Sequence, residues 1–467
     1  MYFFYCLLLL MPVHALESQV FIDSLLDNHG FFEKESLNLE IKRIEMLADY
    51  ANYNNWYWDV EAELARVNKF RDKENYTYYS DYAKHSNQSI RKLSTQLSKR
   101  FFNSGSELEV AYQKSWPILD EALYDNKGYV KDKNTTEYLD GASVKWSLPL
   151  IKNQGGVLDK KTYDLAVLDY EDEVLLLAET KEGFIEDKMM IFLDFIAYQS
   201  QLEVLSRKIK KLEQLLVAVK GSQVDSSALS ALERSLEKSE LERLSLLSKL
   251  EAEQGLLQSL LPSSITVQNL NYPSEFVLIK NPSQYLSQHS RVLQRIQIED
   301  KKNRRYIHNY QQIQLPELDF SLSATRDENQ GNYSTYTRGV SNRYEAKLEF
   351  NYPLTGSEAN QTHLSKYRIK ARQIELKYQD EFADMLAKSQ RLHTLIEQGR
   401  EQLLRYQHQL NLHQPFDSID VQNKQPIRVT IDDIEALSAL HEDYIVERLA
   451  LDKNQVGYDA LLDRLLP

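Results

Sequence analysis

The sequence predicts an α+β membrane protein with an internal two-fold repeat, and three observations support this. Alternating apolar and polar segments occur in both halves of the chain, and two of them, 143–150 and 345–354, end in Pro-Leu. Each of these two leads into a polar helix too long for a compact domain. Tyr163 and Tyr367 follow Pro149 and Pro353 at the same distance. Together these features predict part of a β-barrel and part of a helical tube, made twice.

The composition is typical of a helix-rich protein that does not bind nucleic acid. Of 467 residues, 27% are charged, only 14 are Gly and 11 are Pro, and the formal net charge is −13. Binding to nucleic acid requires clustered Lys and Arg to neutralise phosphates. We therefore expect no nucleic-acid partner.

Residues 1–15 have the pattern of a signal peptide. Tyr2 to Met11 is an apolar run, and Val13 and Ala15 supply small residues before the predicted cleavage site. The flank lacks Lys and Arg, so a buried N-terminal helix is the alternative. Cys6, the only cysteine, falls inside this segment. The mature protein would then have no disulfide, no Cys-bound metal and no thiol nucleophile.

Beyond residue 15 no run reaches the ~18 apolar residues that a membrane-spanning helix needs. Only helices and closed barrels satisfy all backbone hydrogen bonds in lipid. A secreted chain of this kind is therefore either soluble or crosses a membrane as a β-barrel.

The first structural repeat is predicted over 16–266. Two short helices, 18–28 and 33–50, precede four strands, and the segments 67–89 and 118–138 have the polar composition of loops. The strands are expected at about 56–66, 90–102, 107–117 and 142–151. Alternation over about 9–11 positions, with Trp and Tyr near the ends, is typical of transmembrane barrel strands. The alternative is a soluble β-sandwich with one wet face.

A helical hairpin is predicted over 157–261, with a tip at 220–226. Leucine, isoleucine and valine recur at heptad spacing along it, at Leu202, Leu205, Ile209, Leu212, Leu216 and Val219. The second repeat, 267–467, has strands at about 317–325 and 343–354 and a helical hairpin over 357–466 with its tip at 413–431. Because such long helices bury little in a monomer, we expect their apolar seams to meet neighbouring helices, including those of other subunits.

The order of these elements resembles the TolC-type outer membrane efflux (outer membrane factor) family. The resemblance covers nearly the whole mature chain and depends on the strand-Pro-Leu-helix element, the tips and the duplication. It implies a homotrimer, with a shared β-barrel in the lipid of the Gram-negative outer membrane and a periplasmic coiled-coil barrel. It also implies docking to a periplasmic adaptor and an inner-membrane pump. The family's protomer has four strands where this sequence predicts six, so the place of the hairpin 90–117 stays open.

The second tip carries the candidate periplasmic aperture. The resemblance makes Asp432 and Glu435, with Asp433 beside them, candidates for the acidic residues that narrow the entrance. At i and i+3 the first two share a helix face. In a trimer they would form rings of carboxylates that favour cations and raise one another's pKa. The alternative is helix capping by Thr430 with Asp432 or Asp433.

Residues at the tips are the candidates for adaptor contact, with a plain helical turn as the alternative for any one of them. They are Gly221, Ser222, Gln223, Val224, Asp225, Thr430 and Ile431.

No enzymatic constellation is found in the sequence. His393, His408 and His413 lack the spacing and partners of a metal site, and there is no Gly-rich phosphate loop or nucleophile elbow. We therefore expect a non-enzyme without cofactor or metal. The resemblance implies that it serves as the exit duct of an efflux or type I secretion system. The alternative from another class is a secreted or surface coiled-coil scaffold or adhesion protein, which would not need detergent to stay in solution.

Overall fold

The computed structural model describes residues 18–71, 83–124, 130–220, 226–260, 276–331, 339–352, 357–412 and 427–466. The predicted signal peptide and the tip residues Gly221 to Asp225 lie outside the described residues, as does His413. The chain forms two compact units. One comprises 1–40, 171–298 and 374–467 and is called the helical unit here. The other, 41–170 and 299–373, contains every strand and is called the sheet unit.

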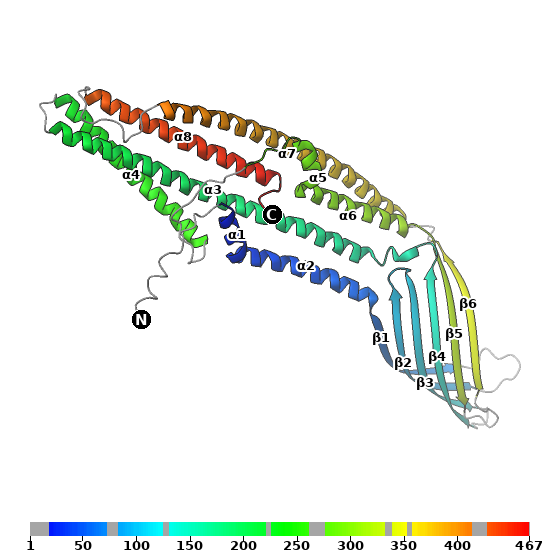
Figure 1. Ribbon diagram of the computed structural model, residues 1–467. Helices are drawn as coiled ribbons and strands as arrows, with labels where there is room; N and C mark the ends of the chain where they lie inside the picture. The colour runs from blue at the N-terminus through cyan, green and yellow to red at the C-terminus, as the bar shows by residue number, and fades with distance from the viewer. Residues whose placement is uncertain are drawn as a thin grey trace, which may run out of the picture. The chain divides into compact units, whose positions relative to one another are not determined.

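One six-stranded antiparallel sheet organises the sheet unit, with its strands in chain order. Figure 1 shows them side by side, β1 at one edge and β6 at the other. Their bounds are β1 Trp56–Arg71, β2 Ala83–Phe101, β3 Ser106–Tyr124, β4 Val130–Pro149, β5 Glu317–Gly331 and β6 Gly339–Asn351. The hairpin 90–117, left open by the sequence, thus lies inside the sheet between β1 and β4.

The strands are longer than the sequence predicts, so the loop predictions for 67–89 and 118–138 are largely wrong. β1 and β2 stay paired as far as Arg71 and Lys84, and β3 and β4 as far as Tyr124 and Val130. Ladder hydrogen bonds join backbone groups and do not depend on side-chain polarity. Alternation of apolar residues therefore detects only the part of each strand that has an apolar face.

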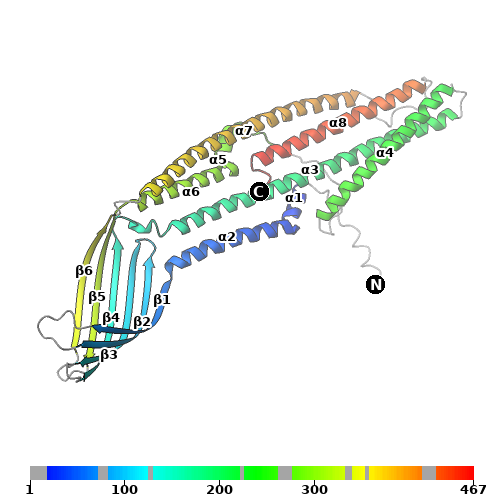
Figure 2. The same cartoon turned by 180° about the vertical axis from the view of Figure 1, so that it is seen from behind.

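Parts of four helices form a row in the sheet unit, within 41–170 and 299–373: α2 Gly30–Asn54, α3 Lys161–Lys220, α6 Arg291–Ile313 and α7 Ser357–Leu412. Ring contacts join α2 to α3 through Tyr50 and Tyr163, 5.5 Å apart. The ion pairs Asp164–Arg305 and Asp169–Lys302 join α3 to α6. The stacked rings of Tyr306 and Tyr367 join α6 to α7. As Figure 2 shows, α2 leads directly into β1, and the row of helices ends at α7.

The helical unit contains three apolar cores among α1 Ser18–Asn28, α4 Ser226–Leu260, α5 Pro282–His289, α8 Ile427–Leu461 and parts of α3, α6 and α7. The first core includes the stacked rings of Phe21 and Phe192, 4.9 Å apart. The second surrounds Tyr458, and the third joins Leu212 of α3 to Leu232 of α4 and Ile434 of α8. The predicted heptad seam of α3 therefore packs against helices of its own chain here, without a second subunit.

Candidate functional site

One face of the sheet is apolar, and its side chains are exposed. Across the six strands one row of directly paired residues reads Trp58, Leu97, Val110, Val144, Ala324 and Tyr344. In this row Trp58 is 72% exposed and Tyr344 81%. Water-exposed apolar surface of this extent is unfavourable and marks a face that meets another apolar phase.

The opposite face of the sheet is polar. The neighbouring row of paired residues reads Asp59, Gln96, Ala111, Ser143, Thr325 and Arg343. Further charged groups on this face include Glu61, Glu109, Lys145 and Lys347, which favour contact with water. A single sheet with one apolar and one hydrated face fits a wall between a lipid phase and water.

The two edges of the sheet are chemically different. Within the described residues, β1 and β6 each pair with only one neighbour. The polar face of β1 presents Asp59, Glu61 and Glu63, whereas that of β6 presents Arg343 and Lys347 among acids. The β1 edge is therefore acidic, whereas on the β6 edge Arg343 and Lys347 alternate with Glu345 and Glu349.

The helices that continue these edges carry exposed apolar residues. On α2, which precedes β1, Ile41, Ile44 and Leu47 are exposed at helical spacing. On α7, which follows β6, Ile369 is 64% exposed. Both α2 and α7 thus leave apolar side chains uncovered in this chain.

At the second tip, the structure gives the predicted aperture acids different surroundings. Asp432 and Asp433 are exposed on α8. Glu435 is exposed as well, but its carboxylate also accepts a hydrogen bond from the Ser235 hydroxyl of α4. Arg428 donates to the Ser227 hydroxyl at 3.1 Å, so α4 and α8 are joined twice by polar contacts. The i and i+3 acids share one side of α8, and one of them is bound to α4 of the same chain.

Thr430 and Ile431 are buried, at 6% and 5% exposed, and Ile431 lies in the third apolar core. Their side chains serve packing here, and contact with an adaptor stays a prediction. The capping alternative does not fit Thr430, because α8 begins at Ile427 and Thr430 lies inside the helix. The helix starts before the predicted position because Ile427, Ile431 and Ile434 continue one apolar face.

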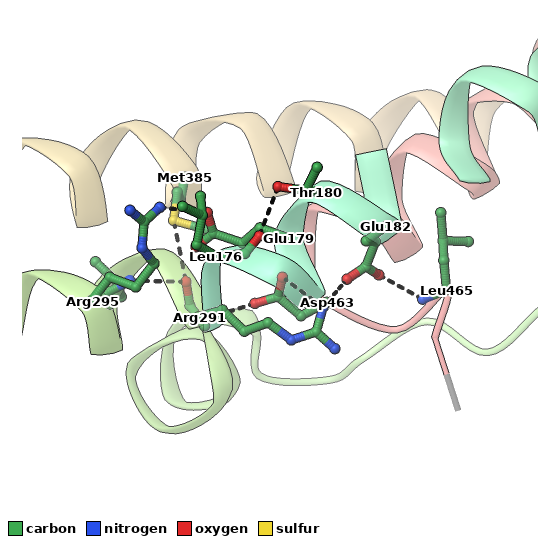
Figure 3. A network of polar contacts seen from close by, with 11 residues as sticks. Leu176, Glu179, Thr180, Glu182, Arg291, Arg295, Met385, Asp463 and Leu465 are labelled. Atoms are coloured by element: carbon green, nitrogen blue, oxygen red, sulfur yellow. Dashed lines mark hydrogen bonds and ion pairs between the residues drawn. The ribbon is translucent and has the colours of Figure 1, made fainter. Parts of the chain in front are cut away.

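A buried polar network joins α3, α6 and the segment 462–466 that follows α8 (Figure 3). One oxygen of Glu182 accepts from the backbone N–H of Leu465 at 2.7 Å, and the other pairs with the Arg291 guanidinium. Asp463 accepts from the backbone N–H of Arg291 at 2.7 Å. Nearby, Arg295 binds Asp172 and Glu179, at 2.9 and 2.8 Å. The network holds 462–466 against α3.

Burial controls the titration of this network. Loss of water around Glu182 raises its pKa to about 7, and the Leu465 N–H and Arg291 only partly offset this effect. Burial also raises the pKa of Asp463 and, beside Arg295, that of Glu179. Glu182 therefore changes charge near neutral pH, where an exposed glutamate is fully ionised.

The sequence analysis missed this network, although it contains a signal for it. Ile185, Met189 and Phe192 are buried at the spacing of a helical seam, and Glu182 occupies the preceding seam position. A carboxylate at an apolar seam position requires partners. The partners Arg291 and Leu465 lie more than 100 residues away in the chain, which the local pattern does not reveal.

Within the described ranges, no three His, Cys, Asp or Glu side chains gather closely enough to hold a metal ion. Every described helix is too short or too polar to span a bilayer.

Comparison with known proteins identifies the fold. No family model and no curated protein sequence matches the chain. Among solved structures it is similar to the outer-membrane channel OprN, with a TM-score of 0.60, 9% identity, and coverage of 96% of this chain and 89% of that one. It is also similar to the channel CusC, with a TM-score of 0.54, 15% identity, and 96% and 92% coverage. A third similar structure is the open Neisseria gonorrhoeae MtrE channel, with a TM-score of 0.54, 12% identity, and 96% and 88% coverage.

These similarities extend over almost the whole of each chain and confirm, for the fold, the resemblance to TolC-type outer membrane factors.

Proposed function

We propose that three copies of this protein form an exit duct in the outer membrane of a Gram-negative cell. The duct would pass the substrate of an efflux or type I secretion system without changing it chemically. The observation that carries the proposal is the sheet with one exposed apolar face and one hydrated face, on a fold shared with outer-membrane channels. In a closed ring of such sheets, the apolar face contacts lipid and the hydrated face lines the lumen.

Ring closure is supported by the strand count and by the edges. Because the sheet is antiparallel and has an even number of strands, β6 runs antiparallel to β1. A rotated copy can therefore pair its β1 with β6 of its neighbour and continue the ladder, leaving no free edge. The acids of β1 would then lie beside Arg343 and Lys347 of β6. In the same step the apolar residues of α2 would face α7 of the neighbouring copy.

The lumen would narrow at the tips, where the acids of α8 lie. Asp432 and Asp433 are exposed, and Glu435 is bound to Ser235. In the proposed trimer, three copies of these acids favour cations at the entrance. The tip residues Gly221 to Asp225, Thr430 and Ile431 are proposed to contact a periplasmic adaptor. The energy for export would come from an inner-membrane pump, because this chain offers no site for energy-yielding chemistry in its sequence.

The test is purification of the mature protein in detergent, followed by mass measurement and single-channel recording in a planar bilayer. We expect a trimer that needs detergent and conducts with cation selectivity. The Asp432→Ala/Glu435→Ala variant should lose most of that selectivity, whereas Glu237→Ala on exposed α4 should keep it. A monomer that is soluble without detergent would instead support a secreted scaffold and overturn the proposal.

A further inference from the structure

The sheet has a central hairpin, β2–β3, whose removal would still leave an antiparallel sheet. β2 pairs with β1 and with β3, and β3 pairs with β4, each over nearly its full length. Because each strand is antiparallel to its neighbour, β1 and β4, which have β2 and β3 between them, also run in opposite directions. Without β2–β3 they could pair directly. The hairpin therefore adds width to the sheet without being needed for its topology.

The hairpin has the same two faces as the strands around it. On the apolar side, Leu97 and Val110 stand between Trp58 and Val144 in one paired row. On the polar side, Gln96 and Ala111 continue the row from Asp59 to Ser143. A hairpin folded into the lumen as a plug would be in contact with water on both faces and would not need Leu97 and Val110 in register with the apolar row. Its pattern is that of a wall segment.

The turn of the hairpin is fixed where α3 begins. Gly105 and Gly156 both have positive φ, +71° and +68°, and their backbones meet closely. A Cβ on Gly156 would lie 2.5 Å from the carbonyl oxygen of Phe102, so any side chain there would displace the turn. The Phe102 ring lies 5.8 Å from that of Tyr50 and 5.3 Å from that of Tyr163. The hairpin is therefore anchored to α2 and α3.

We propose that the β2–β3 hairpin sets the bore of the outer-membrane pore and admits hydrated solutes about 20 Å across. The inference rests on the proposed trimer, in which six strands from each copy make 18. Strands ~4.8 Å apart and tilted by about 40° give 18 strands a backbone diameter of roughly 36 Å. Side chains about 5 Å deep on the inner wall then leave a bore of roughly 25 Å.

The same geometry without the hairpin gives a much narrower pore. Four strands from each copy would make 12, with a backbone diameter of roughly 24 Å and a bore of roughly 14 Å. The difference separates compact or polymeric substrates from small solutes. The hairpin thus limits the size of the substrates that pass the outer end of the duct, independently of any selection by the tips at the periplasmic end.

The experiment measures which reagents reach a cysteine deep on the polar face from outside the cell. Ser147 of β4 is on that face, near the end of the sheet where α3 begins, and it pairs with Glu107 and Ser321. Cells producing Ser147→Cys are treated with rigid maleimide reagents of graded diameter, and labelling is read on a gel. A deletion of 83–124, which joins β1 to β4, is tested beside the full chain. Val144→Cys, on the apolar face, serves as the control for access through lipid.

We expect Ser147→Cys in the full chain to be labelled by reagents up to ~20 Å across, and the deletion variant only by those below ~14 Å. A cut-off near ~14 Å in the full chain, or the same cut-off in both, would overturn the inference. If the deletion variant does not fold, the cut-off of the full chain alone decides. Failure of even a ~8 Å reagent to label Ser147→Cys in folded, membrane-inserted protein would instead contradict the proposed duct.

Discussion

The two units of this protein place their apolar residues in opposite ways. In the helical unit, large side chains such as Phe192, Leu232 and Tyr458 are fully buried in cores shared by several helices. In the sheet unit, the large apolar residues Trp58, Leu348 and Phe350 are 72%, 63% and 65% exposed and lie on one face of the sheet. The helical unit thus has apolar cores of its own, although it also leaves Val217 and Leu412 exposed, whereas the apolar face of the sheet requires an external apolar phase.

The two units therefore differ in what stabilises them: packing within the chain stabilises the helical unit, whereas contact with lipid or detergent stabilises the sheet. Buried area in the helical unit contributes in water. The apolar face of the sheet contributes only when lipid or detergent covers it. Mutations in the two units should therefore respond to different conditions.

The largest effect is expected in the helical unit. Phe192→Ala removes a ring that is 0% exposed and stacked on Phe21, and such changes cost about 3–5 kcal/mol of the free energy of unfolding. Val174→Ala, on an exposed part of the same helix, should change it by less than about 0.5 kcal/mol. Urea unfolding in a fixed detergent measures both. Equal effects of the two changes would contradict the packing described here.

The second largest effect is expected in the sheet, where a charge is placed on either face at two adjacent residues. Val144→Lys places a charge on the proposed lipid face and should cost about 2–4 kcal/mol if the residue lies at the bilayer midplane. Ser143→Lys places the same charge on the hydrated face and should cost less than about 1 kcal/mol. Equilibrium folding into lipid vesicles measures the difference. Should Ser143→Lys prove the more harmful change, the faces would be assigned the wrong way round.

The third effect is a pH dependence that belongs to the helical unit. The folded-state pKa of Glu182, about 7, lies above its ordinary value of 4.5, so the folded state binds more protons between these values. Stability therefore falls as pH rises from about 4.5 to 7, by at most roughly 3 kcal/mol for this group. Glu182→Gln, which cannot titrate, should show a shallower decline.

The groups that face Glu182 are Arg291, Asp463 and the N–H of Leu465. Because Asp452 and Asp459 also have pKa values raised to about 6 by burial, the difference between wild type and variant is the informative quantity. Glu203→Gln, at an exposed i,i+4 pair with Arg207, is the matched control and should leave the pH dependence intact. Parallel curves for wild type and Glu182→Gln would refute the role of Glu182.

The smallest effect concerns the link between α4 and α8 at the tip. Ser235→Ala removes the hydroxyl that binds Glu435, at a cost of about 1–3 kcal/mol for a charge-assisted hydrogen bond. Ser230→Ala on the same helix removes only a bond to the carbonyl of Ser226, and should cost about half as much or less. Hydrogen exchange over the start of α8 measures the local change. No difference between the variants would show that the link does not hold α8.

Sequence reasoning identified the features that follow a local period. Six strands, the long helices and the α3 seam could be predicted because side chains alternate along a strand and recur every three or four residues on a helix. The strand ends beyond Arg66 and before Ile90 could not, since polar side chains there give no alternation. The predicted start of α8 is too late because 427–431 was assigned to the tip, whereas Thr430 and Ile431 are part of a buried face of the helix.

Contacts between distant segments could not be predicted from one sequence. The pairing of Glu435 with Ser235 joins helices from the two halves of the chain, and nothing in the pattern around Asp432 shows which of the acids makes a contact with α4. The insertion of β2–β3 between β1 and β4 likewise depends on strand order, which local periodicity does not encode. The placement of Asp432 and Glu435 on a helix could be predicted, but the contacts of these acids could not, and their role at an aperture stays a prediction.

The central claim is that the two faces of the sheet meet lipid and water, and labelling of neighbouring cysteines tests it most directly. Ser143→Cys and Val144→Cys are made in the chain without Cys6, inserted into vesicles and treated with a small, membrane-impermeant maleimide. Thr325→Cys and Ala324→Cys, their partners on β5, repeat the test on a second strand. We predict rapid labelling at 143 and 325 and little at 144 and 324. Equal labelling at all four positions in the membrane-bound protein would contradict the account, because it would mean that water covers both faces.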